Sequence, residues 1–167
     1  DENGNFISAQ QYGGTGIDLA IDMTVNAAGD LFITGYFTDA ADMDPDAVEE
    51  YILTATGSGF AGYVLHLNNA GEFVKAGITH GGETFNNGIA VDQMDNIYVS
   101  GYFSGTVNFN HDPNGTPINY TSATPYNSFV IKVDPIGIVT SANHLESNDS
   151  HLAYDVDVSW EEFAVYV

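Results

Sequence analysis

The sequence has no cysteine, no arginine and only two lysines, Lys75 and Lys132, against 23 acidic residues. Without cysteine, the chain can form neither disulfides nor thiolate metal sites. The net charge of −21 leaves no basic surface for the phosphates of nucleic acids or for anionic lipids. No apolar run approaches the roughly 18 residues of a membrane helix. We therefore expect no nucleic-acid partner and no membrane insertion.

Apolar residues are nevertheless plentiful, because 44% of the chain is hydrophobic and 13% is aromatic. This content is enough for a packed core, so the acidity does not indicate a disordered tail. The chain opens with the turn-like residues 1–5, without Met or a signal peptide, and closes within the apolar run Phe163–Val167. These ends indicate a folded piece cut from a longer polypeptide.

A long internal repeat organises the chain. The segment GDLFITGYF at Gly29–Phe37 returns as DNIYVSGYF at Asp95–Phe103, so that Gly35 recurs as Gly101. The same period carries the apolar run Tyr63–Leu67 onto Phe129–Val133. A third unit starts at Asp134, which gives about two and a half copies. We divide the chain into repeat 1 (1–67), repeat 2 (68–133) and a partial repeat 3 (134–167).

Each unit has the composition of β-structure, because short runs rich in Val, Ile, Tyr, Phe and Thr alternate with Gly, Asn and Asp clusters. No stretch shows a sustained helical period. We expect strands at Phe6–Gln11, Ile21–Asn26, Leu31–Phe37 and Gly62–Leu67, and in the second unit at Phe73–Ile78, Ile89–Val91, Ile97–Phe103 and Ser128–Val133. The Asx and Gly residues between them predict hairpin turns.

The third strand of each unit indicates how the units assemble. Leu31 and Ile33 point to one face of this strand while Phe32 and Tyr36 point to the other, so both faces are apolar. Such a strand needs a layer on each side. Four-stranded antiparallel meanders stacked around an axis meet this need, and we predict an all-β fold of β-propeller blades. A sandwich or a β-solenoid is the alternative.

Two and a half blades cannot close a ring, so the terminal blades have open faces and unpaired edges. We therefore expect this chain to be part of a larger propeller, or to lie against another chain. Its partners would then include further blades of the same or another polypeptide.

The repeat resembles the bacterial β-propeller family known as SBBP repeats. The motifs that carry the resemblance are Gly81-Gly82, Gly88–Asp92, Asn96–Asn110 and Phe129–Asp134. Repeat 1 departs from the pattern, with Asp42–Pro45 for the Phe-Asp-Pro segment and His66 where Lys is usual. The resemblance implies a secreted or cell-surface protein of a Gram-negative bacterium, of the adhesin-like kind exported by the type IX system. It brings no shared catalytic constellation.

Acidic and amide side chains alternate in two equivalent loops. Hard oxygen ligands in this pattern suit Ca²⁺, which takes six to eight oxygens, although neither loop has the EF-hand pattern. The alternative is a solvated acidic loop. The candidate metal ligands are Asp42, Asp44, Asp46, Asn108, Asn110 and Asp112.

Four aromatic residues fall outside the repeated positions and are candidates for contact with a ligand or partner, for which aromatic side chains are favoured. They are Tyr51, Tyr120, Tyr126 and Trp160. Aromatics that recur with the repeat, such as Tyr36 and Tyr102, are instead typical of packing between units.

These features favour a non-enzymatic binding or adhesion scaffold whose rigid blades present loops to a protein or glycan at the cell surface. Two alternatives remain open at this point. The chain could be a cargo or accessory subunit of the outer-membrane type IX export or gliding apparatus, or a glycan-processing enzyme that uses carboxylates.

Overall fold

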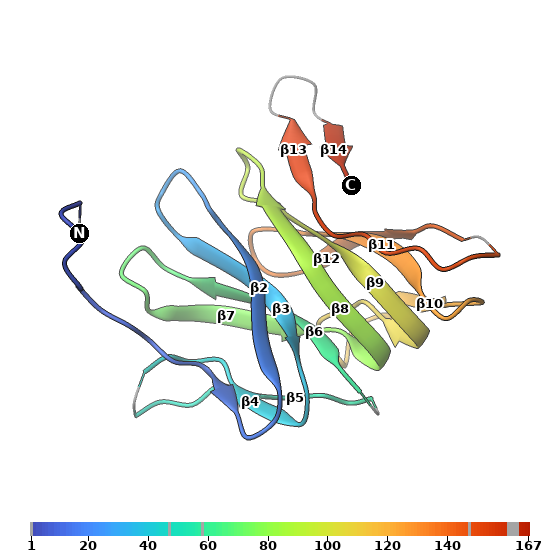
Figure 1. The fold of residues 1–167 in the computed structure, drawn as a ribbon, viewed down its shortest axis with the longest axis horizontal. Helices are drawn as coiled ribbons and strands as arrows, with labels where there is room; N and C mark the ends of the chain where they lie inside the picture. The colour runs from blue at the N-terminus through green and yellow to red at the C-terminus, as the bar shows by residue number, and fades with distance from the viewer. Residues whose placement is uncertain (1, 47, 58, 147, 160–163) are drawn as a thin grey trace.

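The computed structural model describes residues 2–46, 48–57, 59–146, 148–159 and 164–167. These residues form β-strands joined by turns and coil, without a helix, which confirms the all-β prediction. It follows that no helix within these ranges is long and apolar enough to cross a membrane. Figure 1 shows two main sheets, blue to teal and green to orange, that lie against each other.

The first sheet is an antiparallel meander in the order β2-β3-β6-β7. Its strands are β2 (Asp18–Val25), β3 (Leu31–Phe37), β6 (Ala61–Leu67) and β7 (Phe73–Ile78). The β2–β3 hairpin turns on Asn26, whose Oδ1 accepts the N–H groups of Ala28 and Asp30 at 3.0 and 2.9 Å. Gly29 closes this turn with a φ of 88°, a conformation that other residues rarely adopt. Turn chemistry thus fixes the hairpin locally.

The second sheet repeats the meander. Its strands are β8 (His80–Val91), β9 (Ile97–Asn108), β11 (Asn127–Val133) and β12 (Val139–His144), with β10 (Asn119–Thr121) paired to β9. At its first hairpin Asp92 takes the role of Asn26 and accepts the N–H groups of Met94 and Asn96, each at 2.9 Å. The repeat in sequence is therefore a repeat in hydrogen bonding.

Five shorter strands form two small additional sheets. Three of them form a small sheet beside the first main sheet and two start a third unit next to β8 (Figure 1). They are β1 (Gly13–Gly14), β4 (Ala40–Asp42), β5 (Ile52–Thr54), β13 (Asp157–Ser159) and β14 (Ala164–Tyr166).

The core lies between the two main sheets, where β8 packs against β2, β3 and β6. Phe32 and Val64 of the first sheet are buried in one cluster with Ile89, Val99 and other residues of the second sheet. The opposite face of β3 packs Ile33 into a separate cluster within the first sheet. As expected, this strand is buried on both faces.

The predicted strand Phe6–Gln11 is wrong, because these residues are coil and the side chains of Phe6 and Ile7 are 81% and 75% exposed. Its counterpart in repeat 2 is β7, which pairs with β6 and so belongs to the sheet built from repeat 1. A strand at this position needs the third strand of a preceding sheet as its partner. No such strand lies beside residues 6–11 among the described residues.

Candidate functional site

Two long loops leave equivalent ends of the two main sheets. Residues 38–60 join β3 to β6 and carry β4 and β5, while residues 109–126 join β9 to β11 and carry β10. Both loops contain a ladder of Asx turns, in which a side-chain oxygen accepts the N–H two residues ahead. In the first loop Asp42 accepts from Asp44 at 3.0 Å and Asp44 accepts from Asp46 at 2.9 Å. These turns give the loops a defined shape.

The second loop copies this ladder at the equivalent positions of repeat 2. Asn108 accepts from Asn110 at 3.0 Å, Asn110 accepts from Asp112 at 3.0 Å, and Asp112 accepts from Asn114 at 2.9 Å. Asn108 also accepts the N–H of Ile118 at 2.9 Å, which draws the loop closed. The Asn108 amide oxygen accepts backbone N–H groups as the Asp42 carboxylate does, so the turn requires an acceptor oxygen but not a negative charge.

All six candidate metal ligands therefore serve as acceptors for the backbone. Within the ranges that the structure describes, no group of three or more His, Asp or Glu side chains is arranged to hold a metal ion. Asp44 and Asp46 line an open hollow of about 620 Å³ together with Glu49 and Glu72. Calcium binding at these loops stays a prediction.

Three of the four candidate contact aromatics lie against other rings. Tyr51 packs on Phe73 with ring centroids 4.7 Å apart. Tyr120 lies 4.1 Å from the His144 ring and donates its hydroxyl to Ala142 O at 2.8 Å. Tyr126 belongs to a larger cluster at the loop end of the sheets, and Trp160 lies outside the described residues.

This aromatic cluster crosses from the first sheet to the second. Tyr36 meets Phe60 and Phe85 edge to face at 5.2 and 5.1 Å, and Phe85 stacks on Tyr102 at 4.8 Å. Tyr126 meets the Tyr102 ring at 5.2 Å. All five rings are partly exposed, so they form a continuous aromatic surface between the roots of the two loops. Burial raises the pKa of the Tyr102 hydroxyl, and the nearby hydroxyls of the cluster raise it further.

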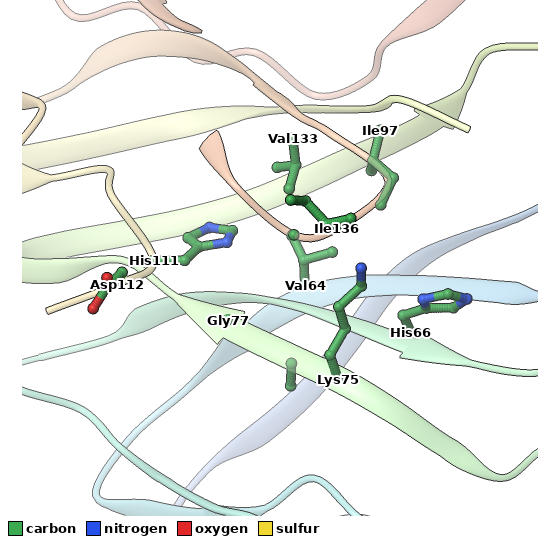
Figure 2. Close-up of a pocket in the computed structure, with 11 residues that line it drawn as sticks. Val64, His66, Lys75, Gly77, Ile97, His111, Asp112, Val133 and Ile136 are labelled. Carbon is green, nitrogen blue, oxygen red and sulfur yellow. The ribbon is translucent and has the colours of Figure 1, made fainter. Parts of the chain in front are cut away.

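A pocket of about 210 Å³ lies between the two sheets, away from this cluster. Figure 2 shows His66 and Lys75 from the first sheet and His111 from the second loop around it. The close approach of His111 requires Gly77, because a Cβ there would lie 2.5 Å from Nδ1 of His111. Asp112, one of the candidate metal ligands, also lines the pocket, together with the apolar side chains of Val64, Ile97, Val133 and Ile136.

Burial favours the neutral forms of the two histidines in this pocket, and the lysine is hydrogen-bonded. Burial, together with nearby His80, lowers the pKa of His111 to about 4. Burial also lowers the pKa of His66, although Asp30 at 3.5 Å opposes this shift. The Lys75 ammonium donates to Pro135 O across the sheet interface. Nε2 of His111 and Nδ1 of His66 are buried without a hydrogen-bond partner, so the pocket can accept water or a small polar molecule.

No family model matches this chain. A search of curated proteins finds no match either. The geometry of the molecule therefore carries the functional argument.

The sequence predicted packing between units for Tyr36, and its contact with Phe85 of the second sheet confirms this. The joining of five rings into one cluster and the pocket were not predicted. Placing Tyr126 outside the repeated positions was wrong, because Tyr102 and Tyr126 stand at the repeat positions of Tyr36 and Phe60. This recurrence could have indicated that equivalent rings meet where the sheets pack. For the pocket no such signal exists, because its polar groups come from separate segments without counterparts of the same type.

Proposed function

We propose that the chain is a segment of a β-propeller from a secreted or cell-surface bacterial protein, and that it acts as a non-enzymatic binding or adhesion scaffold. Two equivalent four-stranded meanders packed face to face support the propeller arrangement. The resemblance to SBBP repeats supports a location outside the cell, because members of that family are exported.

The observation that carries the binding role is the aromatic cluster between the two loops. Tyr and Phe rings offer large, rigid contact areas at a small cost in conformational entropy, and exposed Tyr hydroxyls add hydrogen bonds. The Tyr36, Tyr102 and Tyr126 rings are partly exposed. Phe85 lies between the Tyr36 and Tyr102 rings, and Tyr102 meets Tyr126, so these contacts hold the rings in place. Such a surface suits the apolar face of a sugar ring, so we propose a glycan as the partner.

The charge of the chain narrows the class of glycan. With a net charge of −21, the surface repels sulfated or uronic acid polymers at moderate ionic strength. We therefore propose neutral glycans, which bind through stacking and hydroxyl contacts and stay chemically unchanged.

A glycan array with labelled protein tests this proposal. We expect binding to neutral glycans, without release of sugar, that falls at least about tenfold in Tyr102→Ala and in Tyr126→Ala, because each truncation removes a stacking surface. Phe6→Ala is the matched control, since Phe6 is exposed and lies outside the cluster. No binding to any glycan, or binding that both tyrosine variants retain, would contradict the proposal. Glycan hydrolysis would favour an enzyme instead.

A further inference from the structure

The aromatic cluster between the two loops has a carboxylate at its border, that of Glu83. The register of β8 and β9 places Glu83 opposite Ser104. Two residues further along β8, Phe85 lies opposite Tyr102. Alternate residues of a strand point to the same face of a sheet, so these four side chains share one face. Glu83 is partly exposed there, as the rings are.

Two contacts hold the Glu83 carboxylate beside the rings. Its Oε2 accepts the Ser104 hydroxyl at 3.3 Å. Its Oε1 lies over Gly59, where an added Cβ would be only 2.0 Å away. Gly59 precedes Phe60, a ring of the cluster, and Phe60 O accepts the N–H of Thr84 at 2.9 Å. The first loop and β8 therefore bring the carboxylate and the rings together. We call Glu83 and Ser104 the polar pair.

The first sheet forms without a carboxylate at the position of Glu83. In the register of the strands, Ile17 takes the place of Glu83 in the first sheet. Thr38 takes that of Ser104, and its hydroxyl oxygen accepts the N–H of Ile17 at 2.9 Å. In the second sheet the equivalent hydroxyl instead donates to a carboxylate. The fold of a unit therefore does not require Glu83, which indicates a role in contact with another molecule.

A neighbouring sheet leaves this position open to solvent. Tyr36 of the first sheet meets Phe85 of the second sheet, and Leu19 lies opposite Tyr36. Ile17, two residues before Leu19, shares that face of the first sheet. It nevertheless stays 54% exposed, although the second sheet packs against the face. By the repeat, Glu83 keeps its exposure when a further unit lies beside the second sheet.

The chemistry of the polar pair suits sugar hydroxyls and disfavours sugar carboxylates. A carboxylate accepts up to about four hydrogen bonds, and the Ser104 hydroxyl supplies one. Hydrogen bonds to an ionised acceptor are roughly twice as strong as those between neutral groups. A sugar carboxylate placed beside Glu83 meets a like charge instead. The two lysines of the chain do not relieve this repulsion, because Lys75 donates to Pro135 O and Lys132 lies over the Tyr98 ring.

We propose that Glu83 determines which glycans the aromatic surface binds. While a sugar ring stacks on the aromatic side chains, the Glu83 carboxylate accepts hydroxyl hydrogens of the same sugar residue and repels a uronate. Ser104 is a positioning residue, because its hydroxyl holds Oε2 of Glu83 in place. The inference rests on the proposed function. It assigns the preference for neutral glycans to one side chain, whereas salt screens the repulsion that arises from the net charge.

Binding measured at about 0.5 M NaCl separates Glu83 from the net charge, because the Debye length there is less than about 5 Å. The probes are the neutral glycans that bind the unmodified chain on the array, each beside its uronate counterpart, in which one C6 hydroxymethyl group is a carboxylate. We expect the unmodified chain to prefer the neutral glycan by at least about tenfold. Glu83→Gln lowers the affinity for the neutral glycan about tenfold without lowering that for the uronate, so the preference disappears.

Glu50→Gln is the matched control, because it removes the same charge at an exposed residue next to Tyr51, which packs on Phe73 and not on the cluster. It retains both affinities. A preference for neutral glycans that persists in Glu83→Gln, or that disappears equally in Glu50→Gln, overturns the inference. If Tyr102→Ala abolishes glycan binding while Glu83→Gln leaves it unchanged, the inference fails and the proposed function stands. If no glycan binds the unmodified chain, both fail.

Discussion

Asp22 and Ile89 belong to different sheets, and the N–H of Ile89 donates to Oδ2 of Asp22 at 2.9 Å. Both strands shift register near this contact, between Ala20 and Asp22 in β2 and between Asn86 and Gly88 in β8. A β-bulge leaves a backbone N–H outside the strand ladder. The Asp22 carboxylate accepts the N–H of Met23 in the first sheet and the N–H of Ile89 in the second, so it joins the two bulges.

We expect Asp22→Ala to lower the free energy of unfolding by about 1–3 kcal/mol, because it leaves the N–H of buried Ile89 without an acceptor. Asp22→Asn retains an acceptor oxygen and should cost less. Urea unfolding measures both. Glu50→Ala removes one exposed carboxylate without an inter-sheet contact and is the control. Equal losses in Asp22→Ala and Glu50→Ala would show that the loss of one negative charge, not the hydrogen bond, causes the effect.

A second polar link between the sheets lies entirely inside the core. The fully buried Asn86 amide donates to Thr34 Oγ1 at 3.2 Å and to Tyr63 O at 3.1 Å. We expect Asn86→Ala to lower the unfolding free energy by about 2–4 kcal/mol, since it removes both bonds and leaves a void. The exposed Asn114 offers a control, because Asn114→Ala should change stability by less than about 0.5 kcal/mol. A similar loss in both variants would contradict this assignment.

His66 makes stability depend on pH. Burial lowers its pKa, so the unfolded chain takes up a proton at higher pH than the folded chain. The contribution of His66 to the unfolding free energy is therefore fully present above about pH 6.5 and is lost as the pH falls from there toward the lowered pKa of the folded chain. His66→Gln removes this share of the dependence. We expect the stability advantage of the unmodified chain over His66→Gln to shrink between pH 7.5 and pH 5.5 in urea unfolding, and an advantage that grows would contradict the assignment.

Two substitutions of Asp42 distinguish a structural role of its side chain from a metal-binding role. Its Oδ1 accepts the N–H groups of Asp44 at 3.0 Å and Tyr51 at 2.9 Å, and Asn108 makes the equivalent contacts as an amide. Without calcium, Asp42→Asn should therefore keep stability within about 0.5 kcal/mol, while Asp42→Ala loses about 1–2 kcal/mol. If the loop binds Ca²⁺, added CaCl₂ raises the Tm of the unmodified chain and raises it less in Asp42→Asn. Equal losses in the two variants would contradict the Asx-turn role.

The bounds of a strand can be predicted where apolar and polar residues alternate along it or where its sequence recurs in the next unit. Leu31–Phe37 and Phe73–Ile78 have the predicted bounds, and Gly62–Leu67 is one residue longer at its start in β6. The strands at Ile89–Val91 and Ile97–Phe103 were predicted too short, because β8 and β9 each run for 12 residues. Their extra length is stabilised by pairing with each other, which local sequence does not reveal.

The repeat period, the hairpin turn at Asn26 and strands that need cover on both faces can be read from the amino-acid sequence, because these features depend on neighbouring residues and on their alternation. The folded chain was needed to show that residues 6–11 are coil, that aromatic rings from two sheets form one surface, and that His66 and His111 line one pocket. Those features depend on contacts between residues far apart in the chain, and such contacts form only when the sheets pack. The 59% exposure of Met23 has the same origin, since Ile89, at the equivalent repeat position, is buried against Phe32 of the first sheet.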